Sequence, residues 1–244
     1  MSQASVSTTK DLLKSGNFST GASTNFCFNS LKAISVSNPD DLKLEELLFT
    51  ATLTNDLNEK LRIYQVAAKN FPQDHRAVNN IGAVYYQQNK LAEAKAEFEK
   101  ANSIKDNAIS KNNLAAIAGT QGDRKKTQEL LKQAGGAGEE VKYNQAILDI
   151  LDGKYGSAVS NAGGEASFNK ALAQLLNGDA ATAVKTINNS ADAESGQGYY
   201  LKAIAAARQN NANDVISNIE KAIAKDASWK AKYERDREFL KYQK

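Results

Sequence analysis

The feature that most constrains this sequence is an internal repeat, marked by three landmarks that recur together along the chain. The first landmark is a small residue, the second is a Gly or Asn, and the third lies five residues after the second. All three advance by the same steps of 33, 31, 25 and 32 residues. The series are Gly82, Ala115, Ala146, Ala171 and Ala203; Asn89, Gly122, Gly153, Gly178 and Asn210; and Ala94, Thr127, Ala158, Ala183 and Val215. A repeat of this period predicts a solenoid of stacked units.

Each copy has the pattern of a helical hairpin. In residues 77–101, apolar residues recur at helical spacing on both sides of a turn at Asn89. These residues are Val78, Ile81, Val84 and Tyr85 before the turn, and Leu91, Ala94 and Phe98 after it. We expect Gly82 and Ala94 to lie where the two helix axes approach closely. One hairpin cannot bury both apolar stripes alone, so neighbouring hairpins must stack.

The step of 25 residues predicts a shortened copy in the middle of the chain. The second helix of the copy that starts at Tyr143 is expected to end near Asn161, before Gly163 and Gly164. The stretch from Ala134 to Glu140 has the sequence AGGAGEE, which resembles a cofactor loop only superficially. We expect Gly135 to stop one helix, with Glu139 and Glu140 in the first turn of the next.

The composition favours helices and argues against several kinds of chemistry. The 244 residues include two Pro, one Cys and one His, and so few prolines permit many helices. Cys27 has no partner for an internal disulfide, and Cys27 with His75 cannot supply the four ligands that zinc usually takes. The sequence has no Gly-rich phosphate loop, no GxSxG and no HExxH motif. We therefore expect no catalytic residues, no cofactor and no metal, and no enzymatic activity.

The apolar and small residues of the best copy resemble the tetratricopeptide repeat (TPR) pattern. They are Ile81, Gly82, Tyr85, Ala94, Phe98 and Ala101, continued by Leu114, Ala115, Leu131 and Ala134 in the next copy. The resemblance covers about residues 42–224 and includes an upstream hairpin, whose first helix is expected over residues 44–54 with Leu48 in place of the small residue. It implies an all-α, right-handed α-solenoid of about five to six stacked helical hairpins.

The two ends of the chain differ from the repeats. Residues 1–41 are rich in Ser, Thr and Asn, and form either a linker or a degenerate helical pair. Residues 225–244 are predicted to form a C-terminal capping helix with Trp229, Tyr233 and Leu240 on one face. Seven basic and four acidic residues from Lys225 onward account for the whole net charge of +3. Because the two signs interleave there, we do not expect nucleic-acid binding.

The packing pattern does not explain one recurring series of asparagines. Asn80, Asn113, Asn144 and Asn169 each lie two residues before the small landmark, whereas the fifth copy has Leu201 there. The TPR resemblance implies that first helices line a concave groove and that these four amides hold the backbone of a bound peptide. An amide can donate and accept hydrogen bonds, so it can match a peptide unit in either direction. The asparagines could instead bridge neighbouring first helices, and both roles are compatible.

Four hydrogen bonds are too few to hold a partner, because each contributes only about 1 kcal/mol whereas a micromolar complex needs about 8 kcal/mol. Aromatic anchors must help, and the candidates are Tyr86, Tyr143, Phe168 and Tyr200. A clamp for a carboxylate would need basic residues on successive first helices. Arg76 is the best placed, and the others are Lys111, Lys142, Lys170 and Lys202.

These patterns favour a non-catalytic protein–protein interaction scaffold that binds an extended peptide or a partner surface in the concave groove. One alternative is a structural spacer or assembly arm of a larger bacterial cell-envelope protein, because similar TPR segments are appended to outer-membrane proteins and lipoproteins. The other is a small-ligand or glycan-binding module. The sequence contains no run of about 18 apolar residues, so we do not expect direct membrane insertion. Cytoplasmic and bacterial periplasmic or outer-membrane-associated locations both stay open.

Overall fold

The computed structural model describes residues 42–135 and 138–243, so the predicted N-terminal segment 1–41 lies outside the described residues. The chain divides into two compact units, and the boundary falls between Asn144 and Gln145. We call them the N-terminal unit and the C-terminal unit. All regular secondary structure in the described ranges is helical, which confirms the all-α prediction.

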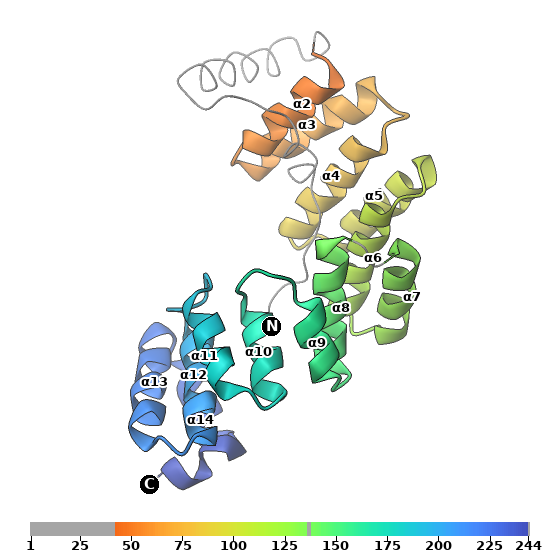
Figure 1. Cartoon of the computed structure of the whole chain (residues 1–244). Coiled ribbons are helices and arrows are strands. Elements are labelled where there is room, and N and C mark those ends of the chain that lie inside the picture. Colours follow the sequence, from red (N-terminus) through yellow and green to blue (C-terminus); the bar gives the residue numbers. More distant parts are fainter. Residues whose placement is uncertain (1–41, 136–137, 244) are drawn as a thin grey trace. The chain divides into compact units, whose positions relative to one another are not determined.

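The N-terminal unit is a stack of helical hairpins. Its helices are α2 (Leu44–Leu53), α3 (Leu57–Asn70), α4 (His75–Gln87), α5 (Leu91–Ile104), α6 (Ala108–Thr120), α7 (Arg124–Ala134) and the first part of α8 (Glu139–Leu151). The pairs α2–α3, α4–α5 and α6–α7 each form a hairpin, and α3 packs on α4 as α5 packs on α6 (Figure 1). The expected upstream hairpin is therefore present, with Leu48 buried in its core.

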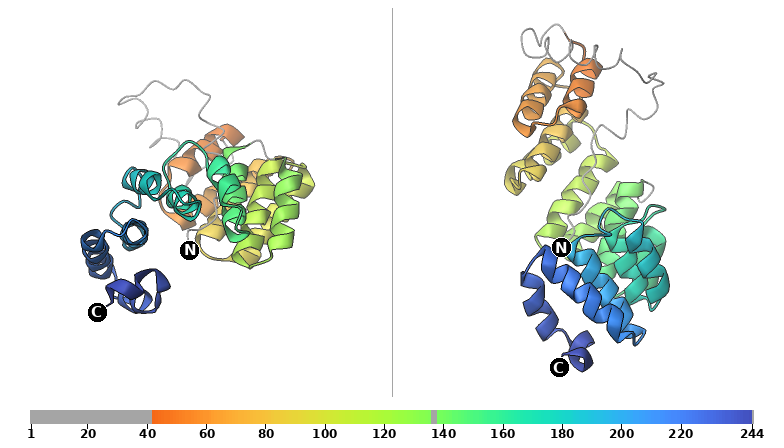
Figure 2. Two further views of the ribbon diagram at one scale, coloured as in Figure 1. Left: turned by 60° about the horizontal axis from the view of Figure 1, so that its bottom comes forward. Right: turned by 90° about the vertical axis from the view of Figure 1, so that its left-hand side faces the viewer.

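The C-terminal unit continues with shorter helices. They are the rest of α8, α9 (Tyr155–Asn161), α10 (Phe168–Leu176), α11 (Ala180–Asn188), α12 (Gly196–Arg208), α13 (Ala212–Lys225), α14 (Ser228–Arg235) and the 3-10 helix η4 (Arg237–Tyr242). Helices α10 and α11 form one hairpin and α12 and α13 another, seen from two sides in Figure 2. Helix α9 has only 7 residues and ends at Asn161, as the short repeat step predicted.

The second landmark of every copy adopts a left-handed backbone conformation. The φ angles are 60° at Asn89, 79° at Gly122, 76° at Gly153, 94° at Gly178 and 59° at Asn210. At each turn the next backbone N–H donates to a carbonyl five residues back, for example Lys90 to Tyr85 at 2.9 Å. This is the Schellman arrangement, which ends a helix and satisfies its last carbonyls. Only Gly and Asn adopt this conformation at low cost, which explains why the series contains these two residues.

The other two landmark series are buried, and one pair of them shows where two hairpin helices touch. The alanines of the first series are all 0% exposed, and the members of the third are at most 6% exposed. At Gly82 a β-carbon would lie 2.7 Å from two ring carbons of Phe98 and 3.2 Å from the carbonyl oxygen of Ala94. The predicted close approach of α4 and α5 is thus confirmed, and it leaves no room for a methyl group.

The predicted helix boundaries also agree with the structure. Gly135 ends α7 with a φ of 86°, and Glu139 and Glu140 lie in the first turn of α8. The side chains of Asp123 and Asp179 accept hydrogen bonds from the backbone at the starts of α7 and α11. These are N-cap contacts, so both aspartates have a structural role.

The C-terminal cap differs from the single helix that was predicted. The chain leaves the helical conformation at Asp236, and α14 is followed by the separate η4. Phe239 is 0% exposed and packs with residues of α12 and α13, whereas Leu240 is 64% exposed. The prediction that Leu240 shares the packing face was wrong, because the break at Asp236 shifts the register by one residue.

Candidate asparagine face

The four predicted asparagines lie on first helices and are buried. Asn80 is on α4, Asn113 on α6, Asn144 on α8 and Asn169 on α10, with exposed fractions of 1%, 0%, 4% and 6%. Each of them lies two residues before the small landmark of its own copy. Asn80, Asn113 and Asn144 belong to the N-terminal unit, and Asn169 belongs to the C-terminal unit.

Amide hydrogen bonds join successive first helices in the N-terminal unit. The Nδ2 atom of Asn113 donates to Oδ1 of Asn79 at 3.1 Å, and Nδ2 of Asn144 donates to Oδ1 of Asn112 at 3.0 Å. Ser110 Oγ also donates to Asn79 Oδ1, at 3.3 Å. The bridging role that the sequence left open is therefore confirmed for two pairs. Asn79 and Asn112 were not among the predicted site residues, although each directly precedes a member of the asparagine series.

Two buried polar atoms on first helices, one of them on a bridging asparagine and the other on a tyrosine that packs with Ala94 and Phe98 of α5, have no hydrogen-bond partner in the described part of the chain. They are Nδ2 of Asn112, whose residue is 0% exposed, and the hydroxyl of Tyr86, whose residue is 7% exposed. Tyr86 lies seven residues after Asn79, so two helical turns bring both to the same side of α4. Burial raises the pKa of the Tyr86 hydroxyl, which keeps it protonated and able to donate.

We define the asparagine face as the asparagines joined by these bonds in the N-terminal unit, together with Asn80 and Tyr86 of α4. It comprises Asn79, Asn80, Tyr86, Asn112, Asn113 and Asn144. Helices α4 and α6 are in direct contact. Bonds from one helix to the next therefore hold the bridging amides in place, and the groups of the face are neutral and buried.

The other predicted aromatic anchors have different surroundings. Tyr143, on α8, is half-buried, and Phe168 packs against the core of α10, α11 and α12. Tyr200 donates its hydroxyl hydrogen to Asp236 Oδ2 at 2.7 Å, and its ring centroid lies 4.8 Å from that of Trp229. Burial and the neighbouring Asp236 carboxylate raise the pKa of Tyr200. Phe168 and Tyr200 thus help to hold the C-terminal unit together.

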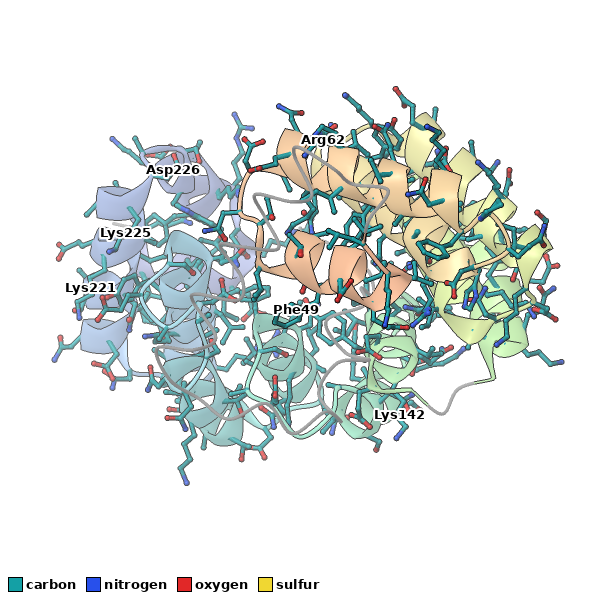
Figure 3. All side chains as sticks on the ribbon, turned by 90° about the horizontal axis from the view of Figure 1, so that it is seen from above. Phe49, Arg62, Lys142, Lys221, Lys225 and Asp226 are labelled. Carbon is teal, nitrogen blue, oxygen red and sulfur yellow. The ribbon has the colours of Figure 1, made fainter. Side chains whose placement is uncertain are left out.

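The five basic residues considered for a carboxylate clamp all bond to groups of this chain. Arg76 forms ion pairs with Asp74 at 2.9 Å and Glu45 at 2.7 Å, and these raise its pKa. The lysines bond to the residues just before or at the start of their own helices: Lys111 to Asp106, Lys142 to Glu139, Lys170 to the carbonyls of Gly163 and Gly164, and Lys202 to the carbonyl of Ala193. Lys142 is labelled at α8 in Figure 3. These bonds compete with any role of the five residues in holding a carboxylate.

Three features of the described chain bear on the alternative functions. Within residues 42–135 and 138–243, no group of three or more His, Cys, Asp or Glu side chains is arranged to hold a metal ion. No helix in these ranges is both long and apolar enough to cross a membrane. The C-terminal unit has a hollow of about 460 Å³ lined by Tyr200, Ala231, Lys232, Arg235 and Asp236. The small-ligand or glycan alternative, for which the sequence indicated no residues, stays a prediction.

Comparison with known proteins shows which folds this chain resembles. No protein-family model matches the sequence, and no curated protein is significantly similar to it. A crystal structure of the APC/C hetero-tetramer Cut9–Hcn1 aligns with a TM-score of 0.70 and 11% identity, over 83% of this chain and 43% of that one. A tetratricopeptide repeat protein from Parabacteroides merdae aligns with a TM-score of 0.57 and 14% identity, over 84% of this chain and 88% of the other.

The chain thus spans less than half the length of the Cut9–Hcn1 chain that it resembles. At these identities the likeness concerns the fold. Together with the hairpins and their left-handed turns, it shows that the chain has a TPR-like helical repeat fold.

Proposed function

We propose that this chain is a protein-interaction scaffold, and that its asparagine face binds an extended segment of a partner protein. The observation that carries the proposal is the pair of buried polar atoms without partners, Asn112 Nδ2 and the Tyr86 hydroxyl. A buried donor without an acceptor costs about 1–3 kcal/mol. Both atoms are covered in the described structure, so a partner that supplies a backbone carbonyl relieves that cost where the side chains over them move aside.

The bridges from helix to helix support the same function. The bonds Asn113 to Asn79 and Asn144 to Asn112 fix the amides before a partner arrives, and groups that are already ordered lose little entropy on binding. Bridging and binding are therefore compatible roles for the series. Within the N-terminal unit, Tyr143 and Arg76 stay proposed secondary contacts beside the face. Asn169, Phe168 and Tyr200 belong to the C-terminal unit, and they stay proposed contacts of that unit by itself.

Tyr86→Phe tests the proposal with little disturbance of the fold. It removes a hydroxyl that has no partner within the described chain, so the free energy of unfolding should stay the same or rise slightly. Loss of one hydrogen bond of about 1 kcal/mol weakens binding about fivefold. The measurement is titration of the partner, identified first by affinity capture from the source cell, against the wild type and the variant.

Tyr64→Phe is the matched control. Tyr64 is a buried tyrosine of α3, 3% exposed, that lies outside the asparagine face. Equal partner affinity in the wild type and the Tyr86 variant, with the fold intact, would show that the partner does not reach this face.

A further inference from the structure

The hollow of the C-terminal unit combines two cations with an apolar wall. Its volume of about 460 Å³ lies in the range of small-molecule sites. Lys232 and Arg235 line it, and their spacing of three residues puts them on the same side of α14. The ring of Tyr200 and the methyl group of Ala231 supply apolar surface. The hollow therefore suits a small ligand that has an apolar part and a negative charge.

The carboxylate of Asp236 also lines the hollow, but its bonds go elsewhere. Its Oδ2 accepts a hydrogen bond from the Tyr200 hydroxyl at 2.7 Å, and its Oδ1 accepts one from the backbone N–H of Glu238 at 2.9 Å. Among residues 42–135 and 138–243, Arg235 has no hydrogen-bond or ion-pair partner. The Nζ atom of Lys232 lies 3.8 Å from the ring centroid of Trp229, in a cation–π contact. The guanidinium of Arg235 is thus available to an anion.

The charges of the lining favour an anion with one charge. Two cations and one carboxylate leave a net charge of +1. A ligand with two negative charges would bring the second one close to Asp236, and like charges repel. The planar fork of an arginine matches the two oxygens of a carboxylate.

We propose that this hollow binds a small carboxylic acid with an apolar chain or ring. The carboxylate of the acid lies against Arg235 and Lys232, and its apolar part lies against Tyr200 and Ala231. This site belongs to the C-terminal unit alone, so it goes beyond the function proposed for the asparagine face.

Trp229 holds one of these cations in place and reports on the hollow. It is the single tryptophan of the chain, and its ring centroid lies 4.8 Å from that of Tyr200. The ring also packs against Gly196 at the start of α12, where a β-carbon would overlap the indole nitrogen. Because the ring is held in this way, Lys232 loses little entropy when an anion arrives. Tryptophan fluorescence therefore follows binding without a label.

The test is a titration of the full chain with 4-methylpentanoate, followed by this fluorescence. We expect a saturable change at millimolar concentrations. The uncharged 4-methylpentanamide has the same shape, and should bind at least about tenfold more weakly because it loses the charge-assisted hydrogen bonds. Phosphate monoesters carry close to two charges at neutral pH, so 3-methylbutyl phosphate should also bind more weakly. Equal affinity for acid and amide, or tighter binding of the phosphate, would overturn the inference.

Arg235→Gln locates the site. We expect it to weaken binding of the acid about tenfold and to leave the weak binding of the amide unchanged. Arg237→Gln is the matched control, because Arg237 is an exposed arginine of η4 that does not line the hollow. Circular dichroism checks that both variants keep their helices. Equal losses of affinity in the two variants would show attraction by the basic end of the chain in general, and would also overturn the inference.

Two further comparisons identify the source of the acid and separate this site from the asparagine face. The peptide acetyl-Ala-Ala-Leu presents a similar group at a chain end, so affinity equal to that of 4-methylpentanoate would mean that the hollow accepts a polypeptide C-terminus, and weaker binding would mean a free acid. Tyr86→Phe should leave binding of the acid unchanged, because Tyr86 belongs to the N-terminal unit. Failure of either proposal therefore leaves the other standing.

Discussion

Gly82 sets the distance between α4 and α5. The ring of Phe98, which is 0% exposed, lies where a β-carbon of residue 82 would be. The other four members of the first landmark series are alanines. This hairpin is therefore the one whose series position is occupied by glycine. The residue at position 82 therefore limits how closely α4 and α5 can pack.

Gly82→Ala should therefore destabilise the protein by about 1–3 kcal/mol, as overpacking of a core does, although alanine favours helix by about 1 kcal/mol. Gly119→Ala on α6 is the control, because its new methyl group would meet the nearest atom, Thr127 Oγ1, at 3.7 Å. We expect that variant to be as stable as the wild type or slightly more so. Urea denaturation measures both, and equal stability of the two variants would contradict the packing argument.

At the residue scale, the sequence predicted the positions of the landmarks but not the bonding of the asparagines. Asn89 and Gly178 could be predicted because a left-handed turn restricts the choice of residue in a way that the sequence records. The bond from Asn113 to Asn79 could not, because an amide suits a ligand and a neighbouring helix equally well. Which amide remains unsatisfied, as at Asn112, depends on packing between helices that no local pattern encodes.

At the element scale, the C-terminal cap shows how a side chain redirects a helix. Asp236 accepts hydrogen bonds from the backbone N–H of Glu238 and from the Tyr200 hydroxyl. An aspartate that bonds its own downstream backbone offers the chain an alternative to the helix, so α14 ends and η4 begins. Helical spacing alone predicted Leu240 at the buried position, and the Asp236 turn gives that position to Phe239.

Neighbouring substitutions test this register. Phe239→Ala should destabilise the C-terminal unit by about 3–5 kcal/mol, as loss of a buried aromatic residue does. Leu240→Ala should have almost no effect, because that side chain is 64% exposed. Thermal unfolding followed by circular dichroism compares the two. A larger loss of stability for Leu240→Ala than for Phe239→Ala would support the single helix instead.

At the scale of the whole molecule, the described chain is built of repeated hairpins, each unit having its own buried clusters. The excess of basic charge lies from Lys225 onward, and the asparagine face is neutral. The spacing of the landmarks was enough to predict the hairpins and the shortened α9. It could not predict the division at Asn144, which falls inside α8, because the compactness of a unit depends on contacts distant in sequence.

The central claim is that first helices of the N-terminal unit, rather than second helices, receive the partner. Hydrogen–deuterium exchange of the full chain, with and without saturating captured partner, tests it most directly. We predict slower amide exchange in α4 and α6 on binding, with α5 and α7 unchanged. Slower exchange in α5 and α7, with α4 and α6 unchanged, would contradict the claim.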